Sequence, residues 1–179
     1  MVATRRMTID EFAEMSLPGI WELVDGEPIE LSPAAGRSGW IAGRLFSRLE
    51  RHVEASGIGW VFPAETGFIL FNDRQTVRSP DAAVVLRDRL AAPPDSFVPL
   101  APDLAVEVLS PSDRMADAMS KITMYLQAGV RLVWLINPQT LTVTVFRQDA
   151  APKTIEEGGI IDGGDVLPGF SVPVAEIFG

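Results

Sequence analysis

The stretch that decides the fold class is DLAVEVLSPSDRMADAMSKITMYLQAGVRLVWLI, residues 103–136. It begins and ends with short apolar runs of strand length, DLAVEVL and RLVWLI. Between them, Ser112 and Asp113 begin a predicted amphipathic helix that stops at Gly129. The side chains expected to face inward recur at helical spacing: Met115, Met119, Ile122 and Leu126. A strand, a helix and a strand in direct succession are typical of an α/β domain.

Upstream of this stretch, the sequence predicts two helices and a hairpin. Residues 7–16 form a short N-terminal helix, for which Thr8 is the expected N-cap in a capping box. Residues 21–31, WELVDGEPIEL, form a hairpin that turns at Asp25-Gly26. Residues 36–56 form a long amphipathic helix, whose apolar stripe repeats every four residues: Ile41, Leu45, Leu49 and Val53.

The remaining segments are mostly β-rich. Short runs in 59–71 and 76–86 precede the deciding stretch, and LTVTVFR at 141–147 alternates as a strand does. Residues 150–179 contain many turn-forming residues and are expected to be a turn-rich tail that ends in a short apolar hook. The whole order indicates one α/β domain, residues 1–179, with a mixed central β-sheet flanked by helices.

Composition excludes several kinds of site. The 179 residues include no cysteine and one histidine, His52, which removes disulfides, thiolate metal sites and multi-histidine metal sites. No apolar run is long enough to span a membrane, and the first residues lack the apolar core of a secretory signal, so a cytoplasmic protein is expected. The net charge of −9 argues against a strong nucleic-acid binder and leaves carboxylates as the main chemical groups.

Two carboxylates stand in unusual positions. Glu107 lies in the middle of the apolar run DLAVEVL, and Asp81 stands at the head of the run AAVVL. If these strands are neighbours, the two acids converge at one end of the sheet, where their repulsion is relieved by a divalent cation. Oxygen ligands of this kind suit Mg²⁺ or Mn²⁺ and favour phosphate-ester chemistry. The alternatives are a turn residue for Asp81 and, for Glu107, a solvent-facing or arginine-paired carboxylate.

Lys121 is the third candidate, on the helix that follows the Glu107 strand. If this helix packs back on the sheet, its ammonium group reaches the carboxylates, where it orients an attacking water or stabilises negative charge. The alternative is a solvated lysine that pairs with Asp117, four residues earlier on the same helix.

Several segments, in order, resemble the Uma2 family of bacterial restriction-endonuclease-like proteins. They are WELVDGEPIELSP, then SPD before an apolar strand, then PDLAVEVLSPSDRMAD with Lys121 and Tyr125, and finally VLPGFSVPVAEIF. The resemblance extends from about Met7 to Phe178.

The resemblance implies the PD-(D/E)XK nuclease fold, a restriction-endonuclease-like fold, and Mg²⁺-dependent cleavage of DNA. It implies that Asp81 and Glu107 are the metal-binding acids of the two half-motifs and that Lys121 is catalytic. Glu22 matches a family glutamate and is expected to complete the acidic site, the alternative being an exposed hairpin carboxylate. The sequence departs from the general nuclease pattern at Leu109, where a lysine would stand. It also lacks a histidine in the stretch 36–40, where many members have one.

A row of arginines offers a contact surface for DNA. Arg37, Arg44, Arg48 and Arg51 fall on one side of the predicted helix 36–56 and could follow a phosphate backbone. The alternative is a solvated face balanced by Glu50 and Glu54, and Trp40 on this helix is expected in the core. With the acidic total, the row predicts weak and salt-sensitive DNA binding.

Two classes of function follow. The first is a Mg²⁺-dependent DNA endonuclease, which could act as a homodimer to cut two strands. The second is a module that keeps the nuclease fold but only binds DNA or protein, favoured by Leu109 and by the net charge. A small-molecule enzyme has no phosphate loop or nucleotide fingerprint to support it.

Overall fold

A computed structural model describes residues 6–16 and 18–179 of the chain. Residues 1–5 lie outside the described residues, and the prediction about a secretory signal rests partly on them. Six strands form the central sheet, in the order β10-β9-β8-β7-β6-β3. Their bounds are β3 Gly59–Pro63, β6 Ala82–Leu86, β7 Leu104–Val108, β8 Leu132–Asn137, β9 Thr142–Arg147 and β10 Ala150–Ile155. Strands β7 and β8 are parallel and the other pairs are antiparallel, which confirms the mixed sheet.

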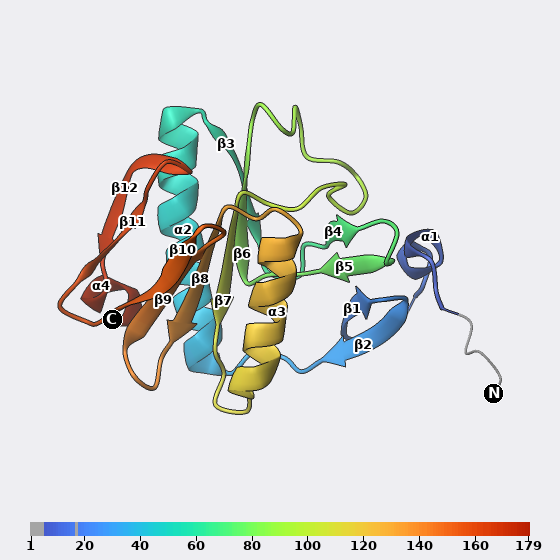
Figure 1. Ribbon diagram of the computed structural model, residues 1–179, viewed down its shortest axis with the longest axis horizontal. Helices are drawn as coiled ribbons and strands as arrows, with labels where there is room; N and C mark the ends of the chain where they lie inside the picture. The colour runs from blue at the N-terminus through green and yellow to red at the C-terminus, as the bar shows by residue number, and fades with distance from the viewer. Residues whose placement is uncertain (1–5, 17) are drawn as a thin grey trace.

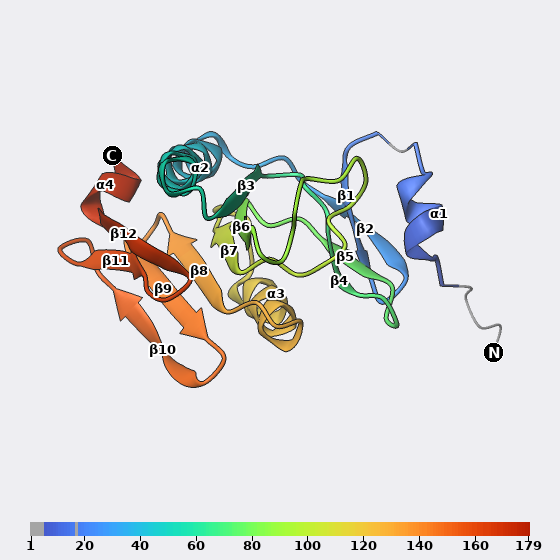
Figure 2. The same cartoon turned by 90° about the horizontal axis from the view of Figure 1, so that it is seen from above.

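Helices cover both faces of the central sheet (Figure 2). The long helix α2, Gly36–Ser56, lies on one face and α3, Met115–Gln127, on the other. Side chains alternate across each strand, so Val106 and Val108 of β7 pack on the α2 side, whereas Ala105 packs on the α3 side. The same alternation directs Glu107 of β7 towards α3. The helix over 36–56 is confirmed, including its left-handed cap at Gly57.

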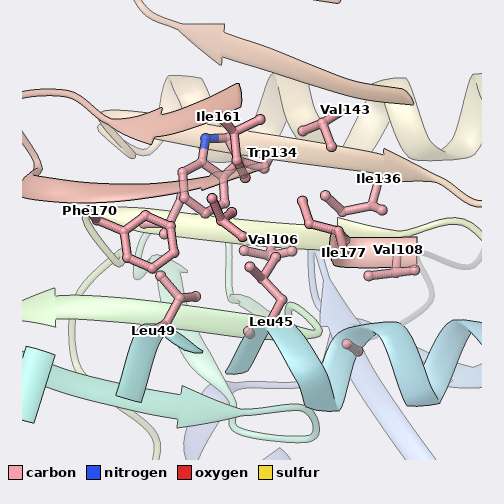
Figure 3. Close-up of a cluster of buried hydrophobic side chains, with 14 of the residues drawn as sticks. Leu45, Leu49, Val106, Val108, Trp134, Ile136, Val143, Ile161, Phe170 and Ile177 are labelled. Atoms are coloured by element: carbon pink, nitrogen blue, oxygen red, sulfur yellow. The ribbon is translucent and has the colours of Figure 1, made fainter. Parts of the chain in front are cut away.

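The core on the α2 side also includes the C-terminal segment (Figure 3). Strands β11 Ile160–Gly163 and β12 Leu167–Pro173 form a hairpin, and α4 Ala175–Phe178 follows it. The ring of Phe170 stacks on Trp134, the largest fully buried side chain, at a centroid distance of 5.7 Å. The segment 150–179 therefore forms strands where a turn-rich tail was predicted, while the predicted apolar hook is present as α4, with Ile177 and Phe178 buried. Pro152, Pro168 and Gly169 lie within strands, and the apolar residues of β12 alternate into the core from Phe170 onward.

A second sheet, in the order β2-β1-β5-β4, lies beside the central one (Figure 1). Its strands are β1 Ile20–Val24, β2 Glu27–Leu31, β4 Phe68–Phe71 and β5 Thr76–Arg78, and α1 Ile9–Ala13 packs against it. The predicted hairpin is confirmed, because Asp25 and Gly26 both adopt positive φ angles between β1 and β2. The predicted capping box of Thr8 is also present.

Two runs that the sequence presented as continuous are each divided between the sheets. The run at 76–86 breaks at Ser79-Pro80 into β5 and β6, and the run at 59–71 breaks after Pro63 into β3 and β4. Proline has no N–H to continue a ladder and restricts the residue before it, so the chain leaves one sheet at these points. The division places Asp81 at the junction of the two sheets.

Three side chains lie differently from their predicted positions. Met115 and Met119 of α3 are exposed, because the buried face of this helix is formed by Ala118, Ile122 and Tyr125. Trp40 of α2 is 47% exposed, so its prediction as a core residue was wrong. None of the helices in the described part of the chain is long and apolar enough to cross a membrane.

Candidate active site

An open cavity of about 360 Å³ lies where β7 ends and β6 begins. Asp81, Glu107 and Lys121 line it together, although they come from the start of β6, the middle of β7 and the middle of α3. Strand β2 and several loops complete the wall, with Glu30, Ser32, Pro33, Glu65, Ser110 and Asp113 among the lining residues. The predicted convergence of the two strand acids and the helix lysine is therefore present in the fold.

Asp81 is held by the neighbouring strand β7. Its backbone N–H donates to the carbonyl of Val106 over 2.9 Å, and its Oδ2 accepts the Val108 N–H over 2.6 Å. Burial raises the pKa of the Asp81 carboxyl, although the Val108 N–H and the Lys121 ammonium oppose the shift. Among the described residues, no protein group donates to Asp81 Oδ1, so this oxygen remains available to a ligand.

Glu107 points towards α3 and meets Tyr125 and Lys121. The Tyr125 hydroxyl donates to Glu107 Oε1 over 2.6 Å, and Lys121 Nζ lies 3.3 Å from Oε2. The pKa of Glu107 is raised to about 7. Burial is the main cause, and the Asp81 and Glu22 carboxylates contribute to the same shift. Burial and the Glu107 charge raise the pKa of Tyr125 well above its ordinary value, so this phenol remains a neutral donor.

Lys121 lies between two carboxylates. Its Nζ is 3.3 Å from Glu107 Oε2 and 3.6 Å from Glu22 Oε1, and its side chain is 21% exposed. Burial disfavours its charge, but these two carboxylates outweigh burial and raise the pKa of Lys121. The alternative of a solvated lysine paired with Asp117 was wrong, because the helix turns Lys121 towards the sheet.

Glu22 is fully buried and does not line the cavity. Its Oε2 accepts Arg78 Nη1, and its Oε1 accepts the Ser79 N–H over 2.9 Å. The alternative of an exposed hairpin carboxylate was therefore wrong. The structure places Glu22 next to the site, where it contacts two residues that line the cavity, Ser79 through its backbone N–H and Lys121 through its side chain.

Sequence reasoning did not assign two members of this cluster, Arg78 and Tyr125. Tyr125 stands one helical turn after Lys121, so its place on the same face could have been deduced from spacing. Arg78 gave no such signal, because nothing in the sequence pattern indicates that its strand β5 pairs with β1 in a second sheet. Only the division of the run at 76–86 places Arg78 opposite Glu22.

The predicted DNA-contacting arginines lie along α2, but two of them contact the C-terminal helix. Arg48 forms an ion pair with Glu176 of α4 at 2.8 Å, and Arg44 donates to the Glu176 carbonyl. The Arg44 guanidinium also stacks over the Trp40 ring at 4.6 Å. Arg37 and Arg51 are exposed. The balancing partner of the row is thus Glu176 rather than Glu50 and Glu54.

The donor set at the cavity fits Mg²⁺ or Mn²⁺. In the described part of the chain, no group of three or more carboxylate, histidine or cysteine side chains is arranged to hold a metal ion. Two buried carboxylates, Asp81 and Glu107, do share the cavity, and burial raises the pKa of each although Lys121 opposes the shift. Mg²⁺ is typically bound by one or two carboxylates together with waters and substrate phosphate. A two-carboxylate site is therefore suited to this ion.

The raised pKa of Glu107 predicts that the stability of the metal-free protein depends on pH. Between pH 4.5 and about 7 the folded state binds more protons at Glu107 than the unfolded state, so stability falls as pH rises. A Glu107→Gln variant remains neutral and escapes this loss. Relative to wild type, we expect it to gain about 3 kcal/mol in free energy of unfolding between pH 4.5 and pH 8.

Urea denaturation in EDTA at the two pH values measures this gain. Glu27→Gln, the same change at an exposed position of β2, is the control and should show no such gain. An equal difference between wild type and Glu107→Gln at both pH values would contradict a raised pKa.

Comparison with known proteins identifies a family and a similar solved structure. The sequence pattern of the Uma2 family, described as "Putative restriction endonuclease", matches residues 9–175. A crystal structure from Anabaena variabilis ATCC 29413, described as a "putative nuclease belonging to DUF820", superposes with a TM-score of 0.81 at 22% sequence identity. The superposition covers 96% of this chain and 97% of that one. No curated protein matches the sequence.

Proposed function

Because the chain belongs to the Uma2 family and has a restriction-endonuclease-like fold, we propose that it is a Mg²⁺-dependent DNA endonuclease. The reaction is hydrolysis of a phosphodiester bond. The observation that carries the proposal is the meeting of Asp81, Glu107 and Lys121 at one cavity. Buried carboxylates with raised pKa values beside a lysine are unfavourable for stability and are typical of functional sites.

In this proposal Asp81 and Glu107 hold the ion. Asp81 has one oxygen held by the Val108 N–H, whereas Glu107 accepts from the Tyr125 hydroxyl at Oε1 and from Lys121 at Oε2. The chemistry that Mg²⁺ supplies when bound is polarisation of the scissile phosphate and a lowered pKa of bound water. The Lys121 ammonium, at the cavity wall, positions the attacking water or stabilises negative charge on the phosphate.

The arginines of α2 supply contacts to the DNA backbone in this proposal. Arg37 and Arg51 are exposed, whereas Arg44 and Arg48 must exchange Glu176 for phosphate. A charge of −9 opposes DNA over the rest of the surface, so binding should be weak and should weaken further with salt.

Incubation with supercoiled plasmid tests the proposal. We expect nicked and linear DNA with Mg²⁺ or Mn²⁺ and intact plasmid with EDTA, because without the ion the carboxylates repel the phosphate. Nuclease activity would be contradicted if plasmid, single-stranded DNA and linear duplex all remained intact with every metal.

A homodimer would place two such sites on the two strands of a duplex, and we include this assembly in the proposal. Light scattering with size-exclusion chromatography measures it directly. A monomer at assay concentrations would contradict the dimer but not the chemistry, since a monomer can nick one strand.

The second candidate is a nuclease-fold module that binds without cleaving. The acidic wall of the cavity favours it, since Glu30, Glu65 and Asp113 add to the site carboxylates and oppose phosphate. Calorimetric titration with Mn²⁺ separates the two candidates, because a module without turnover need not retain a metal site.

A further inference from the structure

A buried carboxylate and arginine lie directly behind the candidate active site. The register of β1 and β5, with Leu23 opposite Val77, places Glu22 opposite Arg78 on adjacent antiparallel strands. Their side chains are 0% and 8% exposed and form an ion pair. The Ser79 N–H donates to the second oxygen of Glu22. Glu22 is thus held from two sides in one orientation.

Of the described residues that line the cavity, Glu22 contacts Lys121 by an ion pair and Ser79 by a hydrogen bond from its backbone N–H. Lys121 Nζ lies 3.6 Å from Glu22 Oε1 and 3.3 Å from Glu107 Oε2, and Lys121 lines the cavity whereas Glu22 does not. A group placed in this way influences the cavity by fixing where the ammonium group lies.

The balance of charge explains why a second carboxylate is needed. When a cation engages Glu107, the attraction between Glu107 and Lys121 weakens, and the cation repels the ammonium group. Glu22 does not line the cavity and is held in place by Arg78 and the Ser79 N–H, so a cation in the cavity weakens its attraction to Lys121 less than that of Glu107. Lys121 therefore retains one firm partner while the site is loaded.

We propose that Glu22 is a positioning residue that holds Lys121 at the wall of the active site, and that Arg78 fixes Glu22 for this purpose. The inference rests on the proposed function for the role of Lys121, but the contact itself does not depend on turnover. It differs from the expectation that Glu22 completes the acidic metal site, because Glu22 is fully buried and does not line the cavity.

The chain provides an internal standard for the test, because Lys121 and Lys153 are its only lysines. Lys153 is exposed on β10, far along the sheet from the cavity. Limited acetylation followed by mass spectrometry measures the labelling of Lys121 relative to Lys153. An amine held between two carboxylates reacts slowly, since acetylation requires it to lose its proton and leave its partners.

In Glu22→Gln we expect the relative labelling of Lys121 to rise on the order of tenfold, the effect of losing one partly buried charge pair. Calorimetry should give a Mn²⁺ affinity within about twofold of wild type, since loss of a metal ligand or its direct support typically costs 10–100-fold. Glu27→Gln is the matched control and should change neither quantity. In Glu22→Gln, Arg78 is left as a buried charge without its partner, which can prevent folding. The double variant Glu22→Gln/Arg78→Met removes both buried charges and provides a folded protein in that case.

Unchanged labelling of Lys121 in a folded variant would overturn the proposal. A fall of tenfold or more in Mn²⁺ affinity would overturn it as well, and would make Glu22 a metal ligand. Neither measurement uses cleavage. If wild type cleaves no DNA and labelling still rises, the endonuclease proposal fails while the role of Glu22 stands.

Discussion

Asp81→Asn is expected to lower the rate of Mg²⁺-dependent plasmid cleavage by about a thousandfold or more, because a bound ion contributes several kcal/mol to catalysis. The amide oxygen can still accept the Val108 N–H that Asp81 Oδ2 accepts now. The substitution also removes a carboxylate whose pKa burial has raised, so the fold should be retained or stabilised. Loss of activity without loss of stability would thus reflect the loss of a negative ligand.

The matched control is Asp113→Asn, which removes a carboxylate from the wall of the same cavity. Its own contact is local, to the Ser110 N–H. We expect its cleavage rate to stay within about tenfold of wild type. If both variants lost activity equally, the net charge of the cavity would matter, and Asp81 would have no special role as a ligand.

Lys121→Met should lower cleavage by about a hundredfold to a thousandfold, the usual effect of removing one preorganised donor from a catalytic site. Methionine fills a similar volume but cannot orient water or stabilise negative charge. Mn²⁺ affinity should be kept or increased, because the ammonium group lies 3.3 Å from a proposed ligand oxygen of Glu107 and repels a cation. Cleavage and metal binding should therefore move in different directions.

Lys153→Met serves as the control for this variant, since it alters the other lysine of the chain, on exposed β10. If Lys121→Met cleaved DNA at the wild-type rate, Lys121 would have no role in the mechanism. A joint loss of cleavage and metal affinity would instead indicate that the site had collapsed.

The core of the site was predictable because it depends on local patterns. Glu107 interrupts an apolar strand, and Asp81 stands at the start of another, so adjacency of two strands was enough to bring them together. Lys121 required only that the helix after β7 pack back on the sheet. These are short-range consequences of burial and strand alternation.

Contacts between sheets could not be predicted in the same way. The run at 76–86 is interrupted at Ser79-Pro80-Asp81, but the placement of its first half in a second sheet depends on pairing with β1, far away in the sequence. Arg78 therefore remained unassigned, and Glu22 could not be distinguished from an exposed hairpin residue. Both depend on strand pairs whose sequence separation exceeds 50 residues.

The C-terminal segment shows a related limit. Its glycines and prolines are frequent enough to predict turns, but β12 is stabilised by packing of residues such as Phe170 on Trp134 and α2. Tertiary contacts of this kind decide strand formation more than local propensity does. The same segment places Glu176 on Arg44 and Arg48, which no pattern within α2 could reveal.

The central claim is that Asp81 and Glu107 together hold a divalent cation beside Lys121. Anomalous diffraction from a crystal soaked in Mn²⁺ tests it most directly. We predict one manganese peak in the cavity, in contact with both Asp81 and Glu107, with Lys121 still beside Glu22. A cavity without a peak, or a peak that neither carboxylate contacts, would contradict the claim.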